Sequence, residues 1–133
     1  MTAKTPKSKK AKGKTLEREV AKAYRHKLFP KAQSMPMSGA MQFNKGDIFK
    51  GVVDEWKDEC KNQETTKLWE WWEQTVNQCY GLEKPVLHIK KNYSEILSVI
   101  RFSDYIELRE TIYDLEEEIR RLKCLSNAQP AKE

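Results

Sequence analysis

The chain has 133 residues, of which 38% are hydrophobic and 34% charged, enough for one domain with a single modest core and a heavily charged surface. No stretch approaches the roughly 20 apolar residues of a membrane span, and the amino-terminus has no apolar signal-peptide core. The three cysteines, Cys60, Cys79 and Cys124, are far apart in the sequence. Their number and spacing exclude a disulfide framework and a zinc knuckle, and favour a reducing, cytoplasmic compartment.

Positive charge is concentrated at the amino-terminus. Residues 1–14 carry six lysines and no acid, so the rest of the chain has a net charge of −1 although the whole chain has +5. Residues 1–12 have almost nothing to bury, which predicts a disordered tail. Such an arm can bind a polyanion through phosphate contacts, or it can serve only solubility. The lysines concerned are Lys4, Lys7, Lys9, Lys10, Lys12 and Lys14.

A first helix is predicted to begin near Thr15 and to end at Pro30. Its apolar residues recur at helical spacing: Leu16, Val20, Ala23, Tyr24 and Leu28. Glu17 lies near the helix start, where a carboxylate favours the positive end of the helix dipole. A second interpretation makes Glu17 a carboxylate of a metal site.

Residues 31–61 are predicted to form three short strands. The first two are expected near residues 32–35 and 47–49, and the third over residues 55–61, after a turn at 51–54. The many charges of the third strand are also compatible with a simple solvated face.

Charged residues in this segment form a pattern typical of a cation site. Glu59 and Lys61 lie two residues apart on the third strand and point to the same face, while Cys60 points to the other. If the segment folds back on itself, Asp47 comes close to Glu59. Two carboxylates and an ammonium on one surface suit a hard divalent cation and an activated water.

A second helix should start at Thr65 or Thr66 as its cap and end before Gly81. Its apolar face is predicted to contain Leu68, Trp72, Val76 and Cys79. Gln74 lies at the border of this face.

Two further strands are predicted at Pro85–Lys90 and Ile96–Phe102. Lys90 and Lys91 close the first of them, where a DNA backbone phosphate could meet them. His88 alternates with apolar neighbours, so we expect a structural role for it.

The last helix is predicted from Asp104 to about Cys124, with Ser103 as its cap. Its apolar residues step by three and four in alternation, which is the pattern of a heptad seam. They are Tyr105, Leu108, Ile112, Leu115, Ile119 and Leu122. The seam either packs on the domain's own sheet or mediates self-association. Residues 126–133 are expected to be a disordered tail.

The order of these features resembles the archaeal and phage-type Holliday junction resolvases of the PD-(D/E)xK nuclease superfamily, over about Lys12 to Arg101. The similar motifs are Gly13 with Glu17, Ser38-Gly39, Gly46-Asp47-Ile48 where Pro-Asp-Ile is usual, Glu59-Cys60-Lys61, and Gln74. The replacement of proline by Gly46 is compatible with the family, because only the aspartate takes part in the chemistry. The long heptad helix lies outside the resemblance.

The resemblance implies an α/β fold of the restriction-endonuclease type, with a mixed central sheet flanked by helices and a nuclease core over residues 13–102. The heptad pattern alone predicts the long helix over residues 103–125 that follows. The resemblance also implies that Mg²⁺, or Mn²⁺ as a substitute, is held by three carboxylates and one carbonyl. The carboxylates are Glu17, Asp47 and Glu59, and the carbonyl is that of Cys60. Lys61 would position or deprotonate the attacking water, and Ser38 and Gln74 would support the phosphate and the lysine.

The function implied is that of a Mg²⁺-dependent DNA endonuclease that cuts branched DNA as a homodimer, in the cytoplasm of a prokaryote or of a phage-infected host. One alternative is another structure-specific or restriction-like nuclease of the same superfamily. Another is a DNA-binding protein that retains the fold without catalysis. The intact set of Asp47, Glu59 and Lys61 argues against the second alternative.

Overall fold

The computed structural model describes residues 6–35 and 46–128, with side chains from Lys10 onward. The elements along the chain are α1 (Pro6–Lys27), β1 (Gln33–Ser34), β2 (Ile48–Phe49), β3 (Trp56–Asn62), α2 (Leu68–Asn77), β4 (Lys84–Lys90), β5 (Leu97–Val99) and α3 (Phe102–Ala128). They form two compact units, which divide between Ile100 and Arg101. None of the described helices is long and apolar enough to cross a membrane.

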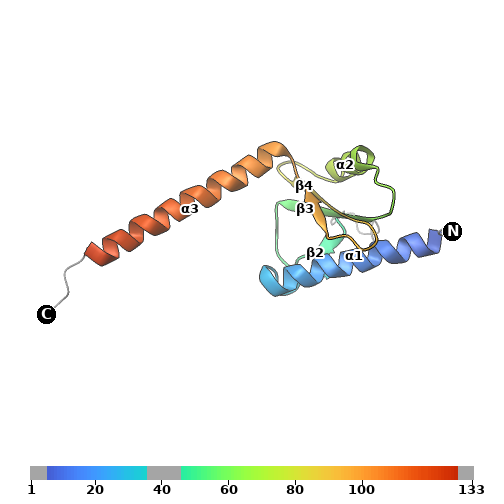
Figure 1. The fold of residues 1–133 in the computed structure, drawn as a ribbon, viewed down its shortest axis with the longest axis horizontal. Helices are drawn as coiled ribbons and strands as arrows, with labels where there is room; N and C mark the ends of the chain where they lie inside the picture. The colour runs from blue at the N-terminus through green and yellow to red at the C-terminus, as the bar shows by residue number, and fades with distance from the viewer. Residues whose placement is uncertain (1–5, 36–45, 129–133) are drawn as a thin grey trace. The chain divides into compact units, whose positions relative to one another are not determined.

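The first unit contains a mixed sheet in the order β3-β4-β5. β4 runs parallel to β3 and antiparallel to β5. β1 and β2 form a separate antiparallel pair of two residues each. The predicted α/β fold with a mixed sheet and flanking helices is therefore confirmed (Figure 1).

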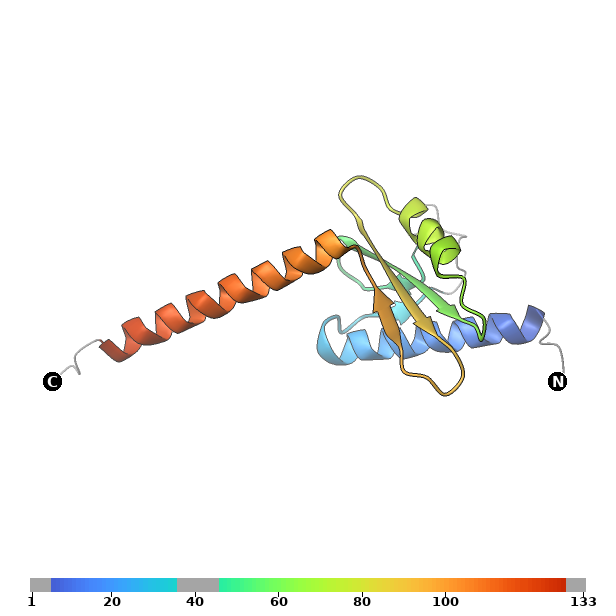
Figure 2. The same ribbon diagram turned by 45° about the horizontal axis from the view of Figure 1, so that its top comes forward.

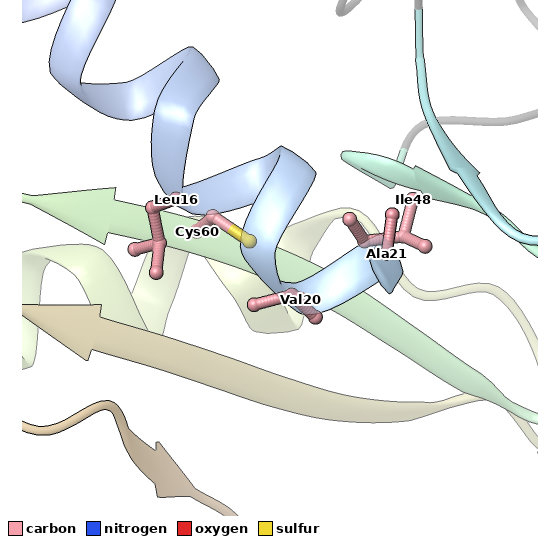
Figure 3. Close-up of a cluster of buried hydrophobic side chains, with 5 residues drawn as sticks. All are labelled: Leu16, Val20, Ala21, Ile48 and Cys60. Atoms are coloured by element: carbon pink, nitrogen blue, oxygen red, sulfur yellow. The ribbon is translucent and has the colours of Figure 1, made fainter. Parts of the chain in front are cut away.

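The two helices of this unit cover opposite faces of β3 (Figure 2). Cys60 packs into the apolar cluster of α1, whereas Glu59 accepts a hydrogen bond from Gln78, just beyond the end of α2. Successive side chains of a strand point to opposite faces, so the sheet lies between α1 and α2. The cluster on the α1 side contains Leu16, Val20, Ala21, Ile48 and Cys60 (Figure 3).

α1 begins at Pro6 rather than near Thr15, so the expected disorder of residues 1–12 is wrong from Pro6 onward. Lysine and alanine are good helix formers and proline is tolerated in the first turn, which explains the longer helix. The buried face also differs, because Ala21 is buried while Ala23 and Leu28 are exposed.

α2 is rotated relative to the prediction. It starts at Leu68, and Lys67 at its N-cap makes no side-chain capping bond, so a threonine cap is not observed. Its buried residues are Trp71 and Thr75 rather than Trp72. A shift of one residue turns a helix by about 100°, since there are 3.6 residues per turn. The shift decides which glutamine faces the sheet.

α3 agrees with the predicted last helix but continues to Ala128, beyond the expected end near Cys124. The strand before it is shorter than expected, because β5 ends at Val99 and the helix begins at Phe102. All six side chains of the predicted heptad seam are exposed.

Candidate functional site

Asp47 lies directly before β2, and its backbone and side chain are both bonded to β3. Its N–H donates to the Asp58 carbonyl over 2.9 Å, and its Oδ2 accepts the Cys60 N–H over 2.8 Å. Gly46 eases this approach, since a Cβ at that position would lie only 3.3 Å from the Asp58 carbonyl oxygen, a tight contact that a small shift could relieve. The chain therefore folds back and brings Asp47 next to β3, as predicted. These two hydrogen bonds hold it there, and residues 46–62 form no regular hairpin.

Glu59 and Lys61 lie on the face of β3 opposite Cys60, as strand alternation predicts. Lys61 Nζ is 3.5 Å from Glu59 Oε1, and Gln78 Nε2 donates to Glu59 Oε2 over 2.7 Å. Glu59 is therefore held by an ammonium on one oxygen and by an amide on the other.

The carboxylates of the site repel one another in a buried setting. Burial raises the pKa of Asp47 to about 7, with a further increase from the charge of Glu59, although the Cys60 N–H opposes the change. Burial also raises the pKa of Glu17, and the charge of Glu59 adds to this, while Lys14 at 3.2 Å lowers it. A cation placed here would relieve the repulsion, so the site fits a positively charged ligand.

The site offers carboxylate oxygens, the type of ligand atom that magnesium prefers. Magnesium takes one or two carboxylates and keeps several waters, and Asp47 and Glu59 are two such carboxylates. Across residues 6–35 and 46–128 no group of three or more His, Cys, Asp or Glu side chains is arranged to hold a metal ion. Glu17 is bound to Lys14 instead.

The glutamine beside the site is Gln78 and not the predicted Gln74, which is exposed. Trp71 and Thr75 are buried, and Gln78 follows Trp71 by seven residues, or nearly two helical turns. Because tryptophans stand at positions 69, 71 and 72, the sequence does not reveal which face of the helix is buried. Gln78 could have been predicted only by assigning Trp71 to the buried face. Ser38 lies outside the described residues.

Three of the predicted nucleic-acid-binding lysines meet on one surface. Lys12 of α1 and Lys90 and Lys91 at the end of β4 line the same hollow, together with Asn62 and Tyr93.

The other lysines of the prediction are placed differently. Lys14 pairs with Glu17, and Lys10 is exposed. Lys7 and Lys9 are in α1 without described side chains, and Lys4 lies outside the described residues.

A buried polar network around Asp58 occupies the α1 face of β3, the face to which Cys60 points. Lys50 Nζ is 2.6 Å from Asp58 Oδ2, and His88 Nε2 is 2.7 Å from Asp58 Oδ1. Tyr24 donates its hydroxyl to the same oxygen over 2.5 Å, and Ser98 lies 2.8 Å from His88 Nδ1. Burial alone would raise the pKa of Asp58, but the bond with His88 and the charge of Lys50 outweigh it and lower the pKa.

The predicted structural role of His88 agrees with this network. The histidine lies on β4 opposite Cys60 in the sheet register, and it is buried. It contacts Asp58 and Ser98 rather than Glu59.

One family model, described as phage putative PDDEXK endonuclease, matches residues 8–127. Neither a curated protein nor a solved structure matches the chain significantly. The matched range contains Glu17, Asp47, Glu59, Lys61 and Gln78.

Proposed function

The chain belongs to the family described as phage putative PDDEXK endonuclease, and on this basis we propose that it is a Mg²⁺-dependent endonuclease of branched DNA. Membership assigns the chain to the nucleases, which bind DNA. The metal, the branched substrate and a homodimeric state are our additions.

The observation that carries the proposal is the buried pair Asp47 and Glu59, with Lys61 3.5 Å from Glu59. Burial and then repulsion by Glu59 raise the pKa of Asp47, and the repulsion favours a cation between the two carboxylates. We propose that Asp47, Glu59 and the Cys60 carbonyl hold Mg²⁺, and that Glu17 lies next to this set. When bound, the metal neutralises charge on the phosphoryl oxygens and lowers the pKa of an attacking water.

The protein's own groups have separate tasks in this proposal. Lys61, whose ammonium lies beside the Glu59 carboxylate, orients the attacking water, or accepts its proton after the ammonium has first given up its own. Gln78 fixes the orientation of Glu59 through its hydrogen bond, and the Cys60 N–H fixes Asp47. Groups held in this way lose little orientational freedom during the reaction, which favours catalysis.

DNA would be bound mainly by lysines outside the carboxylate site. The hollow lined by Lys12, Lys90 and Lys91 supports this, since clustered lysines bind phosphates. A phosphate would there replace Glu64 and Glu19, with which Lys12 and Lys90 are paired in the free protein. A branched substrate is supported by the resemblance to the Holliday junction resolvases, which also supports a homodimer. Simple duplex and flap DNA are the competing substrates.

Substrate choice is tested by cleavage of labelled four-way junctions beside linear duplexes of the same arm sequences, in Mg²⁺, Mn²⁺ or EDTA. Paired nicks confined to the junction, and lost in EDTA, are the expected result. Equal cleavage of the duplex would favour a restriction-like enzyme. Junction binding without cleavage in either metal would favour the non-catalytic alternative.

The site residues are tested by single-turnover cleavage under excess enzyme. Glu59→Gln and Lys61→Ala should each lower the rate about a hundredfold or more, equivalent to roughly 3 kcal/mol of transition-state stabilisation. Gln78→Leu should lower the rate less, because it acts only through Glu59, and Gln74→Leu is its exposed control. DNA affinity in Ca²⁺ should change little in all four variants. A wild-type rate for Glu59→Gln would refute the assignment of the site.

A further inference from the structure

The exposed seam of α3 has the composition of a specific type of coiled coil. Its six residues are 41% to 58% exposed. In heptad terms Tyr105, Ile112 and Ile119 occupy the a positions, and Leu108, Leu115 and Leu122 the d positions. We propose that α3 pairs with α3 of a second copy of this chain as a parallel, in-register, two-stranded coiled coil.

The choice of a second copy and of two strands follows from the side chains. β-branched isoleucine at a with leucine at d favours parallel dimers over trimers and tetramers. The seam extends over nearly three heptads of a 27-residue helix. An α-helix of this length with one continuous apolar stripe gains most of its stability by burying that stripe, and an identical helix offers a matching one.

Charges beside the seam agree with the parallel register. In that register each g position of one helix faces the e position five residues later in the other. The three pairs are Asp104 with Arg109, Thr111 with Glu116, and Glu118 with Lys123. No pair brings like charges together. The exposed pair Glu118 with Lys123 brings opposite charges together, and in the single chain Glu118 is bound to Arg121 of its own helix. Asp104 is buried in the single chain, so it adds a pair with Arg109 only where the dimer exposes it. The charges at the g and e positions therefore permit two copies to pair in the parallel register.

The orientation has a consequence for cleavage, which rests on the proposed function. α3 begins at Phe102, directly after the unit that contains the carboxylate site. A parallel pair therefore attaches both nuclease units to the same end of the coil. An antiparallel pair would separate the two attachment points by about 40 Å, at 1.5 Å per residue. The parallel dimer thus presents two sites to one DNA molecule, as paired cuts in two strands require.

The oligomeric state is tested by sedimentation of the full chain. The wild type should sediment at twice the chain mass of 15.7 kDa. Leu115→Lys with Ile119→Lys should raise the dissociation constant of the dimer at least tenfold. Tyr113→Lys with Cys124→Lys adds the same charge at outward b and f positions and should leave the dimer intact. A seam variant that dimerises like the wild type overturns the proposal, as does a monomeric wild type.

The orientation is tested by oxidative cross-linking of Ile119→Cys in a Cys124→Ala background. In a parallel, in-register pair this a position faces its own counterpart, so a covalent dimer should form. The wild type is the control, because Cys124 lies at an outward f position and should not cross-link. Failure of Ile119→Cys to cross-link in a protein that sediments as a dimer overturns the parallel arrangement.

The functional consequence is tested with supercoiled plasmid that carries one extruded cruciform. The wild type should convert it to the linear form in one binding event, whereas the seam variant should release nicked circles. Linearisation by the seam variant at the wild-type rate overturns the link between coil and paired cutting. If no protein cuts DNA, the proposed function fails, while sedimentation and cross-linking still judge the coil.

Discussion

Replacement of Asp47 by asparagine should stabilise the metal-free protein while it abolishes cleavage. Burial and the charge of Glu59 raise the pKa of Asp47 from 3.8 to about 7. The folded protein therefore binds the Asp47 proton more tightly than the unfolded chain does. As the pH rises from about 4 to about 7, ionisation favours the unfolded chain, and stability falls. At about 1.4 kcal/mol for each pH unit, the loss is roughly 4 kcal/mol.

Asparagine removes this loss and keeps the local contact. Its side-chain oxygen can still accept the Cys60 N–H, which lies 2.8 Å from Asp47 Oδ2. Asp47 is only 6% exposed, so solvent does little to screen the charge. The variant should therefore equal the wild type in stability near pH 4 and exceed it by up to about 4 kcal/mol near pH 8.

Urea unfolding in EDTA at these two pH values measures the effect, followed by repetition with Mg²⁺. Added metal should stabilise the wild type at the higher pH and leave the variant unchanged, since a ligand stabilises the state that binds it. Asp114→Asn makes the same chemical change on the exposed surface of α3 and should show no pH-dependent difference. A stability difference for Asp47→Asn that is equal at both pH values and insensitive to Mg²⁺ would refute the reasoning.

Two further changes test the lysines. Glutamine in place of the four lysines at positions 4, 7, 9 and 10 should flatten the salt dependence of DNA binding by about 3 to 4 in log–log slope if all contact phosphates, and an unchanged slope in a binding titration would exclude them from the interface. Lys50→Met leaves the buried Asp58 carboxylate without its cation and should lower the free energy of unfolding in urea by about 3 to 5 kcal/mol. Lys22→Met on the exposed side of α1 is the control, and an equal effect of both would contradict a specific ion pair.

The arrangement on β3 could be predicted from the sequence because strand alternation has a period of two. Once residues 55–61 are a strand, Glu59 and Lys61 must share a face and Cys60 must take the other. The buried faces of the helices were harder to predict from the sequence. In α2, the buried tryptophan was assigned one residue too late, which rotated the predicted buried face by about 100°. As a result Gln74 was predicted beside the site instead of Gln78. In α1, the charged residues gave no signal for a buried face, although they are good helix formers.

The network around Asp58 could not be predicted from the sequence. Asp58 stands in a run of alternating charges and has the appearance of a solvated residue. Its partners come from three other parts of the chain, namely α1, the loop after β2 and β4, and Ser98 of β5 joins the network through His88. Only the folded chain brings these partners together. No local sequence pattern therefore predicts that the charge of Asp58 is buried and compensated.

The same network explains how repelling carboxylates stay close together. Repulsion between Asp47 and Glu59 tends to move the start of β2 away from β3. Two contacts of Asp58 oppose this movement, because its carbonyl accepts the Asp47 N–H and its carboxylate binds Lys50, three residues after Asp47.

The third tie is the hydroxyl of Tyr24, which follows Glu17 by seven residues on α1 and bonds to the Asp58 carboxylate. Glu17, Asp47 and Glu59 thus lie on segments that are bonded to Asp58, whose side chain points to the face of β3 opposite Glu59. The ion pair and hydrogen bond of Asp58 on the α1 side therefore hold these segments together against the repulsion between the carboxylates. This balance keeps a cation-attracting site assembled before any cation binds.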